Sequence, residues 1–170
     1  AVEQATGQFI GLLDHDDTLD TEALFYVKET IERYNDIDII YSDEDKIDED
    51  GYLCDPYFKP DWSPTHLFSV MYILHFSVIR KSLFLSVGGM RDRFAGAQDY
   101  DLMLRISGLA RRIYHIPKVL YHWRKIPGSA SAEVNAKPKA LENAKLALID
   151  AVKQIDSDAT VEDGLLQGTY

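Results

Sequence analysis

Short apolar runs and helical apolar stripes alternate along the chain and predict an α/β domain. Phe9–Leu13 is an apolar run typical of a buried parallel strand, and a second strand is expected over Ile37–Tyr41. The helix between them can be capped by Asp20 and carries one apolar face. That face consists of Leu24, Val27, Ile31 and Tyr34. Acidic residues follow both strands, which indicates a functional site along the carboxyl edge of the sheet.

The remaining pattern predicts further elements and a division of the chain. Met71–Arg80 is expected to form a third strand, Lys81–Val87 a short helix, and a second helix to begin near Asp99. The run "RRIYHIPKVLYHWR" predicts two short strands broken at Pro117, and Lys46–Pro64 is expected to be irregular. A long helix is predicted over Asn135–Gln154. We therefore divide the chain into a body, 1–133, and a C-terminal helix and linker, 134–170.

Composition and charge narrow the function. The 170 residues fit one domain, and no apolar run approaches the roughly 18 residues of a membrane span. The formal charge of −10 argues against a nucleic-acid partner, which needs basic surface. Acidic residues crowd one window and predict a solvated loop; they are Asp43, Glu44, Asp45, Asp48, Glu49 and Asp50. The single cysteine, Cys54, is typical of a reducing compartment.

The stretch "LLDHDDTLD" at Leu12–Asp20 carries the first candidate chemistry. Asp14, Asp16 and Asp17 lie so close that a metal ion or a cationic protein group is expected beside them. One interpretation is a haloacid-dehalogenase-type phosphatase, with Asp14 as nucleophile and Asp16 as acid/base. The downstream "GAQDYD" is a poor match to the second acidic loop of that class. The phosphatase therefore stays as the alternative.

Five segments in order resemble the inverting family-2 glycosyltransferases of GT-A fold that build bacterial surface polysaccharide. They are "ATGQFIGLLDHDD", "DIIYSDEDKID", "FKPDWSP", "YILHFSVIRKSLFLSVGGMRDRFAGAQDYDLMLR" and "IPKVLYHWRKIPGSAS". The resemblance implies a partial, Rossmann-like GT-A fold with a mixed, mostly parallel sheet flanked by helices. The nucleobase-binding N-terminal part is expected to be absent, so that 1–133 would hold the metal, base and acceptor portion.

The resemblance also assigns roles to individual residues. Asp14-His15-Asp16 becomes the Asp-x-Asp motif, in which Asp16 would bind Mg²⁺ or Mn²⁺ and Asp14 would lie near the ribose or the metal. His122 would be a further metal ligand, and Arg124 would contact the diphosphate. Asp99, at the start of a helix after a Gly-rich loop, would be the general base.

Other candidates receive weaker roles. Gln98 stands where the family usually has Glu, which leaves the base intact but removes a second acid. Asp17 is expected to cap the turn, His75 to be a core histidine unless it contacts the acceptor, and Trp62 to pack rather than to bind sugar. Asp101 is expected to bind Arg105.

The resemblance further implies the partners. A nucleotide-sugar would be the donor and a glycan or lipid-linked molecule the acceptor, with the parent protein acting in the cytoplasm at the inner face of the membrane through peripheral association. An inactive binding module is the non-enzymatic alternative.

Overall fold

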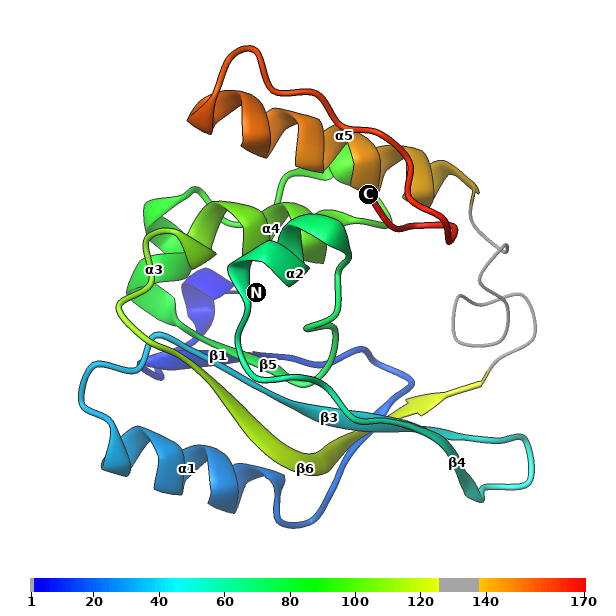
Figure 1. Ribbon diagram of the computed structural model, residues 1–170. Coiled ribbons are helices and arrows are strands. Elements are labelled where there is room, and N and C mark those ends of the chain that lie inside the picture. Colours follow the sequence, from blue (N-terminus) through cyan, green and yellow to red (C-terminus); the bar gives the residue numbers. More distant parts are fainter. Residues whose placement is uncertain (1, 126–137) are drawn as a thin grey trace.

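The computed structural model describes residues 2–125 and 138–170 and shows a curled, six-stranded sheet with helices on both faces (Figure 1). The strands are β1 (Phe9–Leu12), β2 (Thr18–Leu19), β3 (Ile39–Ile47), β4 (Leu53–Tyr57), β5 (Ser77–Arg80) and β6 (Ile113–Arg124). The helices are α1 (Ala23–Arg33), α2 (Pro64–Ser69), α3 (Lys81–Ser86), α4 (Gln98–Ser107) and α5 (Pro138–Ile155), with 3₁₀ turns at Val2–Gln4 and Asp92–Phe94. The sheet order is β1-β5-β3-β6-β2, and β4 pairs with β3.

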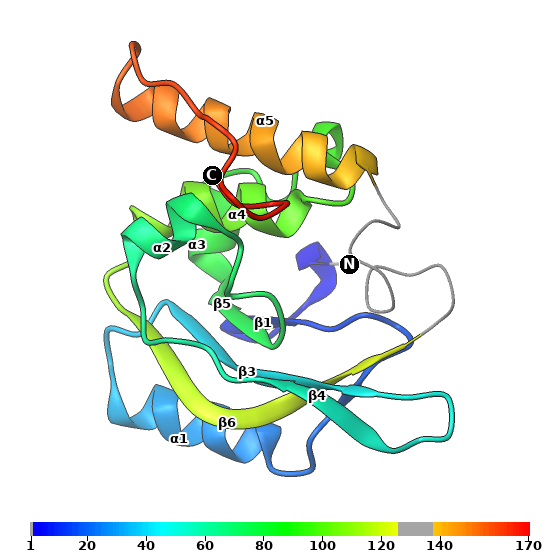
Figure 2. The ribbon, with the colours of Figure 1, turned by 45° about the vertical axis from the view of Figure 1, so that its right-hand side comes forward.

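The predicted α/β class and the mixed sheet are confirmed, but the strands are mostly antiparallel rather than mostly parallel. Only β3 and β6 run parallel among the described pairings. The pairs β1–β5, β3–β5, β3–β4 and β2–β6 are antiparallel. The first strand is therefore an antiparallel edge strand, not a buried parallel one. Helix α1 lies on one face of the sheet and α2 to α5 lie on the other (Figures 1 and 2).

Strand β3 lies at the centre of the sheet and contributes to the cores on both faces. Ile39 and Tyr41 belong to the core that includes residues of α4 and α5, and Ile40 belongs to the core that includes residues of α1. This alternation follows from the two-residue period of a strand, which turns successive side chains to opposite faces. Position along β3 thus decides which helices each residue contacts.

The acidic stretch 43–50 was expected to be a solvated loop, but its first half is part of a strand. β3 continues through Asp43, Glu44 and Asp45, and all three are buried. The predicted solvation holds for Glu49 and Asp50, which are exposed in the turn before β4. Local sequence could not separate these two halves, because a buried carboxylate depends on partners from distant elements.

Three other boundaries differ from the sequence pattern. β6 is one strand across Pro117, and its register against β3 shifts between Ile116 and Val119. Proline lacks an N–H for the ladder, so a register irregularity accommodates it. The third predicted strand is confined to β5, and the segment expected to be irregular contains β4.

The C-terminal helix α5 packs on the loop that leads into α4. A Cβ on Gly96, whose φ is +86°, would lie 2.8 Å from the Cβ of Ala140, and the Asn143 amide donates to the Ala95 carbonyl at 2.8 Å. The predicted division at 133/134 lies outside the described residues. No helix in the described ranges combines the length and apolar content needed to cross a bilayer.

One buried carboxylate lies just before β3 and gives a test of the fold. The Asp38 carboxylate accepts hydrogen bonds from Arg80 Nε at 2.6 Å and from Arg111 Nε at 2.9 Å. Hydrogen bonds from Arg111 are the largest cause of a pKa of Asp38 well below its usual range. A carboxyl with a depressed folded-state pKa stabilises the fold above its unfolded pKa of about 3.9, and this contribution is lost as the pH falls toward the folded value.

We expect Asp38→Asn to lower the free energy of unfolding by about 2 kcal/mol at pH 7, because charge-assisted hydrogen bonds are lost. Urea unfolding at pH 7, 4 and 2.5 measures the difference between the two proteins. The difference should shrink below about pH 4, because the Asp38 carboxyl of the unfolded chain binds a proton there while that of the folded chain, with its lowered pKa, does not. A difference that stays constant over this range would contradict the account.

Candidate functional site

The turn after β1 that contains Asp14, Asp16 and Asp17, called the acidic turn below, is hydrogen-bonded to the end of β6. The Tyr121 hydroxyl donates to Asp17 Oδ2 at 2.5 Å and accepts the Asp14 N–H at 3.3 Å. Asp17 Oδ1 accepts the Arg124 N–H at 2.8 Å, and Arg124 Nε donates to the Asp16 carbonyl at 2.8 Å. Asp17 is buried and Asp14 is exposed. Asp17 therefore has a larger structural role than a local cap, since it joins two strands that are distant in sequence.

His75 completes a group of possible metal ligands with two of these acids. One ring nitrogen of His75 and one carboxylate oxygen each of Asp14 and Asp17 all lie within 4.8 Å of one another. The His75 ring stacks on Tyr121, with centroids 4.6 Å apart, and meets the edge of Trp123 at 5.5 Å. Two carboxylates and an imidazole could hold a divalent cation.

Sequence reasoning treated His75 as a core residue and so missed its place in the site. The segment that carries it lies between α2 and β5 and was expected to be part of a strand. Its position next to Asp14 and Asp17 depends on tertiary packing, and no local motif marks it. The only sequence signal was a histidine within an otherwise apolar stretch.

Asp99 lies at the first turn of α4, as predicted, and its charge interacts with the same group. Burial raises the pKa of the Asp99 carboxyl above its usual value, and the Asp14 charge raises it further. The Tyr100 N–H, which donates to Asp99 Oδ1 at 2.8 Å, and the charge of His75 act in the opposite direction. A half-buried carboxylate with a raised pKa is suited to accept a proton.

The two residues predicted as metal ligands have other partners. His122 Nδ1 lies 2.5 Å from Asp45 Oδ1, and its Nε2 lies 4.0 Å from Asp20 Oδ2. Asp16 Oδ1 lies 3.5 Å from His15 Nδ1. The described ligand group of three contains neither Asp16 nor His122. Asp16 nevertheless belongs to the same turn as Asp14 and Asp17, and the side chain of Arg124 is bound to its backbone.

An ionic network shapes the loop before Asp99. The buried Asp101 carboxylate accepts from Arg91 and, at 2.7 Å, from Arg105 Nη2, which agrees with the expected Asp101–Arg105 pair. Arg91 also donates to Asp150 of α5 at 2.8 Å. Gln98 Oε1 accepts the Gly96 N–H at 2.6 Å, so this residue closes the turn.

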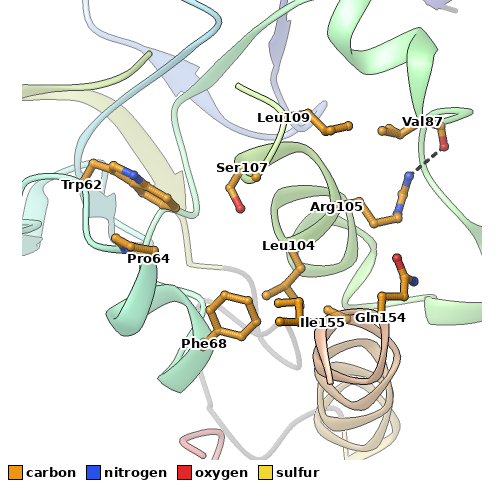
Figure 3. A pocket seen from close by; sticks show the side chains of 12 residues that line it. Trp62, Pro64, Phe68, Val87, Leu104, Arg105, Ser107, Leu109, Gln154 and Ile155 are labelled. Atoms are coloured by element: carbon orange, nitrogen blue, oxygen red, sulfur yellow. Dashed lines mark hydrogen bonds between the residues drawn. The ribbon is translucent and has the colours of Figure 1, made fainter. Parts of the chain in front are cut away.

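A cavity of about 710 Å³ lies at the other end of α4 from Asp99 (Figure 3). Trp62 and Phe68 line one side of it, and Leu104 and Ile155 lie on the helices opposite. Arg105, whose Nη1 donates to the Val87 carbonyl at 2.9 Å, borders it as well. The lining contains no carboxylate, and Trp62 packs against the core as expected. This cavity therefore does not have the ligands of a metal or proton-transfer site.

No family model matches the chain, but individual proteins do. The chain is 50% identical over 150 residues to the uncharacterized protein y4gI of Sinorhizobium fredii, and this match covers 87% of the chain and 16% of y4gI. It is 44% identical over 126 residues to the O-antigen biosynthesis protein RfbC of Myxococcus xanthus (74% of the chain, 10% of RfbC). It is 27% identical over 123 residues to a chondroitin synthase of Pasteurella multocida (72% and 13%). The chain thus spans less than a fifth of the length of each.

The fold is similar to that of a solved structure, S. aureus TarS 1–349 in complex with UDP. The TM-score is 0.62 at 17% identity, and the match covers 96% of the chain and 45% of the TarS chain. At this identity the likeness concerns the fold, and the relatives above supply the sequence evidence. Together they confirm the prediction: the chain belongs to the family-2 glycosyltransferases and has a partial GT-A fold.

Proposed function

We propose that the chain is the metal-, base- and acceptor-site portion of an enzyme that transfers a sugar from a nucleotide-sugar to a glycan or lipid-linked acceptor. The observation that carries the proposal is the grouping of ligand atoms of Asp14, Asp17 and His75 within 4.8 Å of one another. The charges of two of these residues, Asp14 and His75, also act on the Asp99 carboxyl. The UDP bound to the TarS neighbour supports a nucleotide-sugar donor. Two of the relatives are named for O-antigen biosynthesis and chondroitin synthesis, which gives no support to the phosphatase alternative.

The acidic turn would lie beside the diphosphate of the bound nucleotide-sugar. A bound Mn²⁺ or Mg²⁺ would act as a Lewis acid toward the departing nucleoside diphosphate. Asp14, Asp17 and His75 fit such an ion, because they offer two carboxylates and one imidazole within a 4.8 Å group. The resemblance favours Asp16 and His122 instead, and the two ligand sets can be separated by experiment. Arg124 lies at the turn and would contact the diphosphate from there.

Asp99 would act as the base of an inverting displacement. The acceptor hydroxyl oxygen would form a bond to the anomeric carbon of the donor while the bond from that carbon to the diphosphate oxygen breaks. The hydroxyl proton would pass to the Asp99 carboxylate. The raised pKa of Asp99 supports this role, since a stronger base takes the proton more readily.

Location and acceptor remain parts of the proposal. We infer a lipid-linked or glycan acceptor from the polysaccharide names of the relatives, with the parent protein acting in the cytoplasm through peripheral association with the inner face of the membrane.

A first experiment distinguishes the two sets of metal ligands. We expect Asp14→Asn, Asp17→Asn and His75→Ala each to weaken Mn²⁺ binding by the chain at least about tenfold, because each removes a ligand. Asp16→Asn and His122→Ala serve as matched substitutions outside this group and should change the affinity by less than about threefold. Titration calorimetry with Mn²⁺, with and without UDP, measures the affinities. The reverse pattern would contradict our ligand set and favour the one implied by the resemblance.

A second experiment tests Asp99. We expect Asp99→Asn to abolish transfer from a nucleotide-sugar by the full-length protein and to raise, not lower, the unfolding temperature at pH 7. A carboxyl with a raised folded-state pKa stabilises below its unfolded pKa and loses this contribution as the pH rises, so the ionised form disfavours the fold at pH 7. The thermal difference should therefore vanish below about pH 4.

The exposed Asp92 provides a control for this substitution. Asp92→Asn removes a carboxylate seven positions before Asp99 and should leave the rate of sugar transfer unchanged. If Asp99→Asn kept full activity in a radiolabelled-sugar transfer assay, the base assignment would be wrong.

A further inference from the structure

A buried ion pair lies directly behind His75. The Lys59 ammonium and the Glu44 carboxylate are 2.9 Å apart, and their side chains are 0% and 5% exposed. Lys59 follows β4 and Glu44 lies on β3, so the pair joins two residues that are 15 positions apart in sequence. Lysine and glutamate are rarely this buried unless they are paired. Neither residue belongs to the group proposed above to bind the ion or to take the proton.

The pair binds the backbone of His75 on both sides. The His75 N–H donates to Glu44 Oε2 at 3.0 Å, and Lys59 Nζ donates to the His75 carbonyl. Lys59 Nζ also donates to the Ile73 carbonyl at 2.6 Å. The donor and the acceptor of the His75 backbone are thus both held by one ion pair, which leaves this residue little freedom to shift.

The segment that the pair holds has an unfavourable backbone conformation. Leu74 has φ +41°, in the left-handed region that non-glycine residues seldom adopt. Such a conformation persists only when its surroundings determine it. Ser77 Oγ donates to the Leu74 carbonyl at 2.7 Å, between the two carbonyls that Lys59 binds. Side chains therefore satisfy the carbonyls of three consecutive residues here, in a segment that belongs to no strand or helix.

The lysine is itself fixed to the sheet. Its N–H donates to Asp43 Oδ1 at 2.9 Å, and the same oxygen lies 2.7 Å from His115 Nε2. The Tyr41 hydroxyl donates to the carbonyl of Pro60, the next residue, at 2.7 Å. β3 therefore binds the backbone of Lys59 through Asp43, the backbone of Pro60 through Tyr41, and the Lys59 ammonium through Glu44.

We propose that Lys59 and Glu44 are positioning residues that set the His75 imidazole against Tyr121 and toward Asp14 and Asp17. A buried ion pair is weak evidence for stability, because apolar residues of similar volume often serve as well. The contacts of this pair instead fix His75, the one residue of the ligand group that lies outside the acidic turn. The inference rests on the proposed function only in the role it gives to His75.

The test separates positioning from stability with three variants of the chain. Lys59→Met leaves the Glu44 carboxylate buried without its cation, and should lower the unfolding temperature strongly. The double variant Lys59→Met with Glu44→Leu removes both charges and should unfold at a higher temperature than the single variant. Asp38→Asn breaks the ion pairs of another buried carboxylate, which lies just before β3, and serves as the matched control.

Two readouts follow His75 itself. In the wild type, stacking on Tyr121 should shift the His75 ring proton resonances upfield in the NMR spectrum, with assignment by the His75→Ala variant. We expect the double variant to lose this shift and to bind Mn²⁺ at least about tenfold more weakly, as is usual when support behind a ligand is removed. Asp38→Asn should keep both the shift and the affinity despite its lower stability.

The outcomes are distinct. A folded double variant that keeps the wild-type His75 resonances would overturn the proposal, since the pair would then be a structural feature only. If the wild-type chain binds no Mn²⁺, the proposed ion is wrong, but the ring resonances still decide whether Lys59 and Glu44 position His75. Loss of the His75 shift in Asp38→Asn would also count against the proposal, because any destabilised variant would then show it.

Discussion

The structure depends on the pairing of buried carboxylates along and beside β3. A carboxylate loses its hydration when it is buried and must find a cation, an imidazole or an N–H group in exchange. Each acid in this row has such a partner from outside β3. The pairs are Asp38 with Arg80 and Arg111, Asp43 with His115, Glu44 with Lys59, and Asp45 with His122. In a chain of formal charge −10, these contacts decide how loops and strands meet around the sheet.

This pairing also explains why His75, and not His122, lies beside Asp14 and Asp17. His122 lies next to Tyr121 on β6, yet its imidazole is held by Asp45, while Tyr121 binds the acidic turn. The imidazole that reaches Asp14 and Asp17 comes instead from His75, whose backbone is held by Glu44. Asp45 thus binds the ring of His122, whereas its neighbour Glu44 binds the backbone of His75 and leaves the His75 ring free to face the acidic turn.

Much of the fold and part of the site could be predicted from the sequence, and the limits have a physical cause. The start of α4 near Asp99 and the acidic turn after β1 lie where expected, because a Gly-rich loop precedes the helix and an apolar run precedes the turn. The burial of Asp43 to Asp45 could not be seen, because a polar segment has the same local pattern in a loop and in a paired strand. His75 was missed for a related reason, since its partners are 16 residues or more away. The antiparallel edge strand β1 likewise depends on its pairing with β5.

The central claim is that His75 and the acidic turn share one ion beside Asp99. The most direct test is a crystal structure of the chain with Mn²⁺ and UDP, with the ion located by its anomalous scattering. Our account predicts a peak within coordination distance of a His75 ring nitrogen and of the carboxylates of Asp14 and Asp17. A peak bound by His122 and away from His75, or no peak at a concentration that saturates binding, would contradict it.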